Sequence, residues 1–164
     1  VNWIKIGDTK NVTRYLYSTS EKITKEGSKM SRLVVEGDLI LSNSMSFGRP
    51  YILMISGYIH DGWFVLRPNH NVDTEYLYDV ISSTQIQSQF VSLASGAIVK
   101  NISGDLVKKA ILPLPSLSEQ KKIVKKLYAL SAETKKLEVI YTQKLGDLEE
   151  LKKSILKQAF SGEL

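Results

Sequence analysis

The 164-residue sequence contains no cysteine, which excludes disulfide bonds and thiolate metal sites and fits a cytoplasmic location. Its two histidines, His60 and His70, lack the spacing of a metal site. No apolar run approaches the length that a membrane span requires, and the first residues do not form a signal peptide. We therefore expect a cytoplasmic protein that has no membrane segment and binds no metal.

Sequence motifs of the common enzyme classes are missing as well. There is no Gly-x-x-x-x-Gly-Lys phosphate loop, no Gly-x-Gly-x-x-Gly fingerprint and no Gly-x-Ser-x-Gly nucleophile elbow. Four acids lie close together in the sequence, but turns and helix caps explain them better than acid–base catalysis: Asp61, Asp73, Glu75 and Asp79. We therefore predict a chain without catalytic residues.

The composition is that of a folded globular protein, because 43% of the residues are hydrophobic and 24% are charged. The formal net charge is +5 at pH 7, and the isoelectric point is about 9.3. This mild basic excess is compatible with binding to nucleic acid but does not establish it, since many cytosolic proteins are equally basic.

The last third of the chain carries a seam of apolar or small residues separated by alternating steps of four and three. Spacing of this kind, sustained over more than three heptads, indicates a coiled coil. The alternative is a helix packed on its own domain, but a rod of about 65 Å is too long for a head of about 110 residues to cover. Polar seam positions weaken packing but can fix register and partner. The seam residues are Ile123, Leu127, Leu130, Thr134, Leu137, Tyr141, Lys144, Leu148, Leu151 and Ile155.

Both ends of this helix have recognisable signals. Two prolines precede it, and Ser116 followed by Glu119 fits a capping box, although Ser118 is an alternative cap. Gly162 suits the end of the helix. We therefore predict a helix from about residue 116 to residue 160.

The head, residues 1 to about 110, combines short β-rich runs with two helical segments. Asp61-Gly62 between two apolar runs predicts a β-hairpin, Asp73 can cap a helix, and residues 22–29 are expected to form a loop. We expect strands at residues 3–6, 33–35, 39–41, 51–59, 63–66, 98–99 and 106–112, and helices at 73–81 and 85–93. The fold class is α+β: a mixed α/β domain at residues 1–114, followed by a long coiled-coil-forming helix at residues 115–164.

The segment from Val80 to Val99 has no charged residue but contains several serines and glutamines. Such a stretch can face a polar ligand, or it can be a helix that is half buried in the domain. The structural explanation is favoured, and the ligand remains an alternative.

Two motifs flank the long helix: Pro-Leu-Pro-x-Leu-x-Glu-Gln-x-x-Ile at Pro113–Ile123, and Glu-Leu-Lys-Lys-Ser-Ile-Leu-x-x-Ala-Phe-Ser-Gly-Glu-Leu at Glu150–Leu164. With them the chain resembles the DNA specificity subunit of type I restriction–modification systems. In the head, Trp3–Asp8 resembles the opening of a target recognition domain of that family. Three further segments stand in the family's usual order, so that the resemblance covers essentially the whole chain: Glu36–Ile40, Tyr76–Tyr78 and Ser95–Ser103.

The resemblance implies that this chain is half of a specificity subunit, either alone or within a longer protein. A full subunit has two recognition domains, each followed by a conserved helix, and the two helices pair antiparallel. A single unit is then expected to form a homodimer that binds an interrupted inverted repeat in double-stranded DNA. The helix would also dock methyltransferase subunits and, through the complex, a restriction subunit. Those partners would use S-adenosylmethionine, ATP and magnesium in a prokaryotic cytoplasm, while this chain binds no cofactor and is no enzyme.

Candidate DNA-contacting residues follow from chemistry. Asparagine and arginine make bidentate contacts to base edges, and lysine and arginine contact phosphates. A polar loop supplies Asn43, Ser44, Ser46 and Arg49, and a strand end supplies Arg67, Asn69 and His70. Lys100 and Asn101 follow a glycine-containing turn, and Lys25, Lys29 and Arg32 are candidates for the phosphate backbone. The apolar and aromatic seam residues predicted to hold the dimer are Ile123, Leu127, Leu130, Leu137, Tyr141, Leu148, Leu151 and Ile155.

Two other functions fit the same features. The chain could be the specificity end of a fused restriction–methylation enzyme whose catalytic domains lie elsewhere. It could also be a structural or regulatory coiled-coil protein whose head binds protein or single-stranded nucleic acid. Binding to duplex DNA separates the leading hypothesis from the last one.

Overall fold

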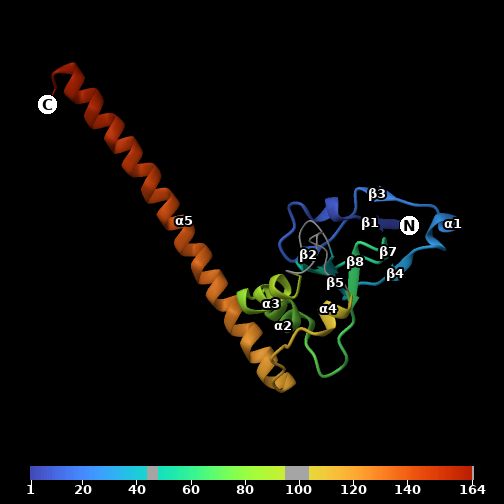
Figure 1. Ribbon diagram of the computed structural model, residues 1–164. Coiled ribbons are helices and arrows are strands. Elements are labelled where there is room, and N and C mark those ends of the chain that lie inside the picture. The colour runs from blue at the N-terminus through green and yellow to red at the C-terminus, as the bar shows by residue number, and fades with distance from the viewer. Residues whose placement is uncertain (44–47, 95–103, 164) are drawn as a thin grey trace. The chain divides into compact units, whose positions relative to one another are not determined.

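The computed structural model describes residues 1–43, 48–94 and 104–163. The chain forms two compact units, Val1–Lys121 and Lys122–Leu164. The first unit holds all the strands and short helices together with the first turn of α5 (Leu117–Ser161), and the second unit is the rest of that helix. The predicted class, a mixed α/β head followed by one long helix, is confirmed (Figure 1).

Two four-stranded sheets make up most of the head. The first has the order β3-β1-β7-β4, formed by Glu21–Lys22, Asn2–Ile4, Gly57–Ile59 and Arg32–Val34. The second has the order β2-β6-β5-β8, formed by Tyr15–Leu16, Pro50–Leu53, Leu39–Ser42 and Trp63–Leu66. The pairs β1–β7 and β2–β6 are parallel, and the other pairs are antiparallel.

Strand β5 shows how the layers are built. All four of its residues are buried, because both faces of its sheet are covered. Ile40 joins a core between the two sheets, whereas Leu39 and Leu41 point the other way, into a core shared with two helices. Figure 1 shows α2 (Thr74–Ser82) and α3 (Thr84–Ala94) on the side of β5 that faces away from β1.

The two helices predicted in the head are confirmed, and each has a local cause. The carboxylate of Asp73 accepts a hydrogen bond from the backbone N–H of Tyr76 at 3.0 Å, which caps α2. Ile81 of α2 and Phe90 of α3 are buried against the second sheet. In each helix the apolar residues recur with helical spacing, so they lie on the face that packs against the sheet.

The prediction of one strand over residues 51–59, followed by a hairpin, is wrong. The segment divides into β6 and β7, which lie in different sheets, and β8 pairs with β5 rather than with β7. A Cβ at Gly57 would lie 2.8 Å from the backbone oxygen of Asn2, so the glycine permits close approach of β7 to β1. The Asp61-Gly62 turn carries the chain from one sheet to the other.

Two further assignments differ from the prediction. Residues 106–112 are no strand, because α4 (Gly104–Lys108) is a short helix and the residues after it have no regular structure. Residues 22–29 hold part of β3 and the short helix α1 (Lys25–Ser28), which the hydroxyl of Thr24 caps. The first strand ends at Ile4, before a 3₁₀ turn at Ile6–Thr9. The strand expected at residues 98–99 lies outside the described residues.

Both predicted ends of the long helix are confirmed. The Ser116 N–H donates to the Glu119 carboxylate at 3.0 Å, and the Glu119 N–H approaches the Ser116 hydroxyl at 3.4 Å, so Ser116 is the cap. Gly162 has φ +74°, and the Glu163 N–H donates to the Gln158 carbonyl at 2.9 Å, which is a Schellman motif. The helix continues through Gly146 without a break.

Gln120 anchors the start of the long helix to the head. Its side chain is fully buried. The side-chain oxygen accepts the backbone N–H of Asp73 at 2.8 Å, and the amide nitrogen donates to the carbonyls of Asn71 and Pro115 at 3.0 and 2.8 Å. One amide group therefore satisfies three backbone groups at the start of α2 and α5.

We expect Gln120→Met to lower the free energy of unfolding of the head by about 2–3 kcal/mol, because three backbone groups lose their partner in a buried place. Denaturant titration monitored by the fluorescence of Trp3 and Trp63 measures this loss. Gln158→Met, on an exposed part of the same helix, is the matched control and should change the head's stability by less than about 0.5 kcal/mol. Equal stability of the two variants would contradict the anchoring role.

The uncharged helix α3 uses its glutamines in the same way. The Gln87 amide donates to the carbonyls of Gly48 and Ile81 at 3.0 and 2.8 Å. The Gln89 amide exchanges two hydrogen bonds with the backbone of Ile111, at 3.2 and 3.0 Å. For these two residues the polar character of the segment is structural, and the helix is half buried as the favoured explanation predicted.

Candidate nucleic-acid interface

Three predicted DNA-contacting residues form a row across one end of the second sheet: Arg49 before β6, Asn43 after β5, and Arg32 beside β8. The Ser42 N–H donates to the Arg49 carbonyl at 3.2 Å, and the Asn43 N–H donates to the Gly62 carbonyl at 3.0 Å. The Arg32 guanidinium donates to the Trp63 carbonyl at 3.1 Å. The Asn43 side-chain amide donates to the Asp61 carbonyl at 2.9 Å. The fold thus brings two cations and an amide from one stretch of the sequence, residues 32–49, to the same end of the sheet.

Arg49 is exposed and lies at the start of β6. Its guanidinium lies over the Tyr51 ring, 5.6 Å from the centroid, and donates to the Val12 carbonyl at 3.3 Å. These contacts are weak in geometry, so the side chain keeps most of its donors for a ligand.

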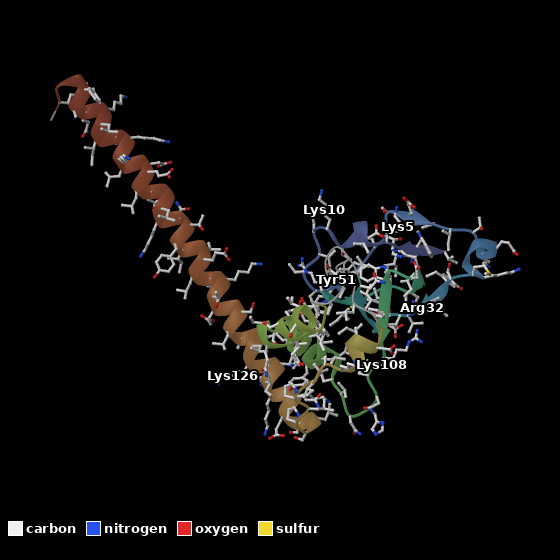
Figure 2. The ribbon with its side chains drawn as sticks, viewed as in Figure 1. Lys5, Lys10, Arg32, Tyr51, Lys108 and Lys126 are labelled. Carbon is white, nitrogen blue, oxygen red and sulfur yellow. The ribbon has the colours of Figure 1, made fainter. Side chains whose placement is uncertain are left out.

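The loop before β2 lies next to Arg49, because Val12 of this loop contacts the Arg49 side chain. The sequence alone did not predict that this loop belongs to the site. Lys10 and Asn11 of the same loop are exposed. The side chain of Lys10 extends away from the ribbon (Figure 2). A single lysine in a short loop gives no signal in the sequence, and only the contact with Arg49 places it here.

The other end of the row borders a shallow hollow between β1, β4 and the β7–β8 turn. Trp3, Arg32 and His60 line it, together with Met30, whose side chain is 96% exposed. The Trp3 and His60 rings lie 6.1 Å apart. A Cβ at Gly62 would lie 2.2 Å from the His60 ring, so a larger residue in the turn would have to displace this ring. The hollow therefore offers aromatic faces and a cation beside the row.

Arg67 lies at the opposite end of β8 from this row and has a structural partner. The strand register pairs Ser42 with Trp63 at one end and Leu39 with Leu66 at the other. The Arg67 guanidinium donates to both carboxylate oxygens of Asp38, at 2.8 and 2.9 Å, and this ion pair raises the pKa of Arg67. Asp38 is buried, so the pair holds the turn before β5.

The remaining candidates do not join the row. Asn69 accepts the backbone N–H of Asn71 at 3.0 Å, and His70 is exposed in the same loop. Lys25 begins α1, and Lys29 is the residue that caps its C-terminus and pairs with Glu26 at 2.7 Å. Ser44, Ser46, Lys100 and Asn101 lie outside the described residues.

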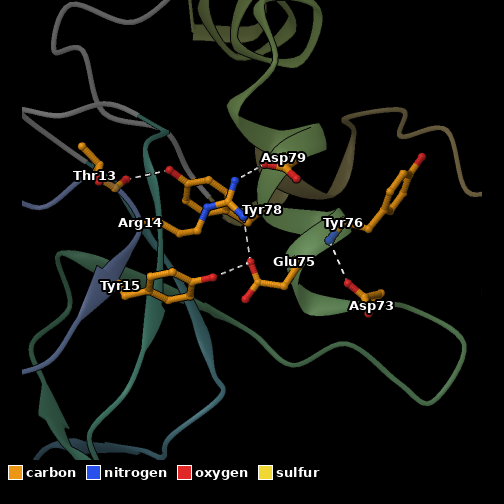
Figure 3. A network of polar contacts seen from close by, with 8 residues as sticks. All are labelled: Thr13, Arg14, Tyr15, Asp73, Glu75, Tyr76, Tyr78 and Asp79. Carbon is orange, nitrogen blue, oxygen red and sulfur yellow. Dashed lines mark hydrogen bonds and ion pairs between the residues drawn. The ribbon is translucent and has the colours of Figure 1, made fainter. Parts of the chain in front are cut away.

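A polar network connects the loop before β2, which contacts Arg49, to α2 (Figure 3). Arg14 donates to the Glu75 carboxylate at 2.8 Å and pairs with Asp79, and its guanidinium lies 4.2 Å from the centroid of the Tyr78 ring. The Tyr78 hydroxyl donates to the Thr13 carbonyl at 2.6 Å. Glu75 and Asp79 thus hold the loop that contacts Arg49.

Burial raises the pKa of Asp79, and the positive charge of Arg14 only partly offsets this effect. Because the folded pKa is above the unfolded value of 3.8, the folded state binds the proton more tightly. The contribution of Asp79 to the free energy of unfolding is therefore fully present below the unfolded pKa and is lost as the pH rises through the folded pKa. The free energy of unfolding of the neutral mimic Asp79→Asn, relative to that of the parent, should therefore increase as the pH rises from about 3.5 to about 7.

Urea titrations of both proteins at the two pH values measure this change. A difference between Asp79→Asn and the parent that does not vary with pH would contradict the raised pKa.

The seam predicted on α5 is exposed along the second unit. Leu127, Leu137 and Leu148 are 42%, 52% and 61% exposed, and every described residue from Lys125 onward is exposed. A contiguous apolar stripe of this length is unusual on a monomer and marks an interaction surface. In the described part of the chain no helix is both long and apolar enough to cross a membrane.

The family model described as "Type I restriction modification DNA specificity domain" matches residues 1–153, which include the head and most of α5. The chain belongs to this family. The match runs through both units, and the matched residues contain the row, Gln120 and nine of the ten seam positions.

Specificity subunits of type I restriction enzymes are the relatives of this chain in sequence. The StySPI subunit of Salmonella potsdam is 32% identical over 102 residues, which are 60% of this chain and 21% of the relative. The EcoBI subunit of Escherichia coli is 33% identical over 89 residues, 54% of this chain and 19% of the relative. The MjaIX subunit of Methanocaldococcus jannaschii is 26% identical over 129 residues, 75% of this chain and 29% of the relative. The matched segments thus cover less than a third of each relative.

Solved structures share the fold of this family member. The chain matches a structure described as a type I restriction–modification system in assembly and conformational transition, with a TM-score of 0.69 and 18% identity. It matches the HsdS subunit from Thermoanaerobacter tengcongensis with a TM-score of 0.60 and 19% identity. These likenesses cover 100% and 99% of this chain but 39% and 37% of the solved chains. The match therefore includes both the head and the helix.

Proposed function

We propose that this chain is one DNA-recognition half of a type I specificity subunit: the head contacts one half of an interrupted target site, and α5 joins it to a second half. The observation that carries the proposal is that one family match runs through head and helix together. The row of Arg49, Asn43 and Arg32 supports it, because these side chains supply the donors that contact base edges and phosphates.

The chemistry of restriction and modification belongs to partner proteins under this proposal. Methyltransferase subunits dock on the helix and use S-adenosylmethionine, and a restriction subunit of the same complex uses ATP and magnesium. This chain then acts without catalysis or cofactor, in the cytoplasm of a prokaryote. Its contribution is the choice of the DNA site.

Two copies of the chain pair through α5, so that the assembly has two heads. The exposed seam supports this pairing, because its apolar side chains need a second helix to cover them. Two identical heads related by a two-fold axis bind two identical half-sites in opposite orientation. The expected target is therefore an inverted repeat with a central spacer.

The test is selection from a library of duplexes that contain random inverted repeats with spacers of varied length, carried out with the methyltransferase partner present. We expect one motif and one spacer to be enriched. The affinity should fall with added salt, because phosphate contacts release counterions. Equal binding to all duplexes in the presence of the partner would refute the proposal.

The methylome of a strain with and without the gene provides an independent measurement. Loss of methylation at one symmetrical motif would give the half-site sequence and the spacer together. An unchanged methylome in a strain that expresses the partner subunits would contradict the proposed role.

A further inference from the structure

The first sheet presents a ladder of aromatic and apolar side chains on the face that points away from the second sheet. Trp3 of β1 pairs with Tyr58 of β7, and Tyr58 pairs with Leu33 of β4, so the three side chains lie on one face. Their neighbours Ile4 and Ile59 point the other way, into the core between the sheets. Trp3 and Tyr58 are only half-buried and Leu33 is exposed, so the ladder is accessible from solvent.

The hollow beside Arg32 adjoins this ladder, where His60 follows β7 on the same face as Tyr58. Its volume is about 450 Å³, which is in the range of small-molecule sites. The rings of Trp3 and His60 line it, with their centroids 6.1 Å apart and their planes tilted by 53°. The almost fully exposed side chain of Met30 lines it as well. A flat aromatic ring can therefore contact two rings and a flexible thioether here.

Positive charge beside the rings complements a phosphate group. The Arg32 guanidinium donates to the Trp63 carbonyl at 3.1 Å, and this bond orients the side chain while using one of its five N–H donors. The surrounding segment, residues 25–32, carries three cations and one carboxylate. Asp61 also lines the hollow, but its carboxylate is fully exposed, so water and salt screen its charge. The local charge therefore favours an anion.

This combination of groups fits an unpaired nucleotide better than it fits an apolar peptide. A nucleobase stacks on aromatic side chains and its phosphate pairs with arginine, whereas an aliphatic side chain gains nothing from a guanidinium. A base inside a duplex is covered on both faces by its neighbours, so only a base that has left the stack can enter the hollow. Arg32 belongs both to the row and to the hollow, so one DNA molecule can contact both.

We propose that this hollow binds one unpaired nucleotide of DNA. Its base contacts the rings of Trp3 and His60, the side chain of Met30 covers the base, and Arg32 binds the adjacent phosphate. The inference rests on the proposed binding of DNA by the head, and it adds a contact that depends on the local distortion of the DNA rather than on its sequence. The head then favours DNA in which a base is already unpaired, because unstacking a base costs free energy.

Two duplexes of the same arbitrary sequence test this site with the full chain, one fully paired and one with a single unpaired thymidine inserted in one strand. Fluorescence anisotropy of the labelled duplexes measures both dissociation constants. We expect the bulged duplex to bind about fivefold tighter or more, because one base can stack on the protein. The ratio of the two constants cancels the charge attraction that both duplexes share. Equal binding of the two duplexes would overturn the proposed site.

Substitutions locate the preference on the protein. Trp3→Leu removes the ring and should abolish the preference for the bulged duplex, whereas Tyr17→Leu, at an exposed aromatic residue outside the hollow, should retain it. Met30→Glu places a carboxylate beside the nucleotide and should weaken binding of the bulged duplex about tenfold. Since Met30 is almost fully exposed, this variant keeps the fold and remains informative if Trp3→Leu fails to fold.

Ile111→Glu is the matched control for the added charge, because Ile111 is an exposed apolar residue of the head that does not line the hollow. It should weaken binding of both duplexes by the same small factor and leave their ratio unchanged. A preference for the bulged duplex that survives in Met30→Glu, or that Ile111→Glu removes equally, would overturn the assignment of this preference to the hollow.

The emission of Trp3 reports the stacking directly. A base that stacks on an indole quenches its fluorescence, while the fully buried Trp63 contributes a constant background. Saturation with the bulged duplex should therefore quench the parent protein more than Trp3→Phe, and an equal fractional change in both would overturn the contact with Trp3. Selection of duplexes with the methyltransferase partner remains a separate measurement. A motif enriched there without any preference for the bulge would refute the nucleotide site alone, and failure of both experiments would refute the proposed function as well.

Discussion

Leu137→Glu should convert the dimer to a monomer while the head stays folded. Leu137 is 52% exposed in the single chain, and it lies in the apolar seam through which two copies of α5 are proposed to pair. The two-fold axis introduces two carboxylates into one apolar interface, where each loses its hydration without gaining a partner. We expect the dissociation constant to rise at least about a hundredfold, a loss of about 3 kcal/mol. Light scattering combined with size-exclusion chromatography measures the change.

Val139→Glu is the matched control for this experiment. Val139 lies two residues further along the helix, is 65% exposed and falls outside the seam. The same substitution there should leave the dimer intact, and both variants should keep the head's unfolding temperature. If Leu137→Glu remained dimeric, or if Val139→Glu dissociated equally, the seam would be the wrong surface.

The parts of the fold that the sequence predicts are those with local causes. The capping box at Ser116 and Glu119, the left-handed glycine at Gly162 and the cap at Asp73 each lie within a few residues of the helix end that they define. Hydrogen bonds between near neighbours in the sequence are enough to mark these ends. Each of these features was predicted from the sequence and is confirmed.

The pairing of the strands could not be predicted in the same way. The run at residues 51–59 is mostly apolar, yet β6 pairs with β2 and β5 whereas β7 pairs with β1 and β4, so the two strands enter different sheets. Strands of three or four residues carry too little alternation to specify a partner. The hairpin signal at Asp61-Gly62 predicts the turn correctly, but it does not determine whether the two strands on either side of the turn pair with each other.

The prediction of DNA contacts was limited in the same way, because local sequence carries no information about long-range partners. Arg49 and Arg67 are the same residue type, and each lies next to a strand, Arg49 directly before β6 and Arg67 directly after β8. Only the fold shows that Arg67 reaches Asp38, which precedes it by 29 residues, and that Arg49 lies in the row with Asn43. The residue type predicts what a side chain can bind, and the tertiary structure determines which partner it meets.

Arg49→Ala and Arg67→Ala should therefore separate DNA recognition from stability. Arg49→Ala should weaken specific binding by about 1–3 kcal/mol, if the side chain contacts a base, and should change the free energy of unfolding by less than about 0.5 kcal/mol. Arg67→Ala leaves the buried Asp38 carboxylate without its two guanidinium hydrogen bonds, which should destabilise the head by about 2 kcal/mol. Its sequence preference should not change.

Lysine at each position makes the distinction sharper. Arg49→Lys keeps a positive charge for a phosphate but loses the two-point contact, so it should bind with relaxed sequence preference and a nearly unchanged salt dependence. Arg67→Lys should recover part of the lost stability, because one charged hydrogen bond to Asp38 remains possible. Competition between cognate and altered duplexes, together with urea titration, measures both properties on each variant. If Arg49→Ala kept its full sequence preference, Arg49 would not contact a base, and if Arg67→Ala lost preference without losing stability, the roles of the two arginines would be reversed.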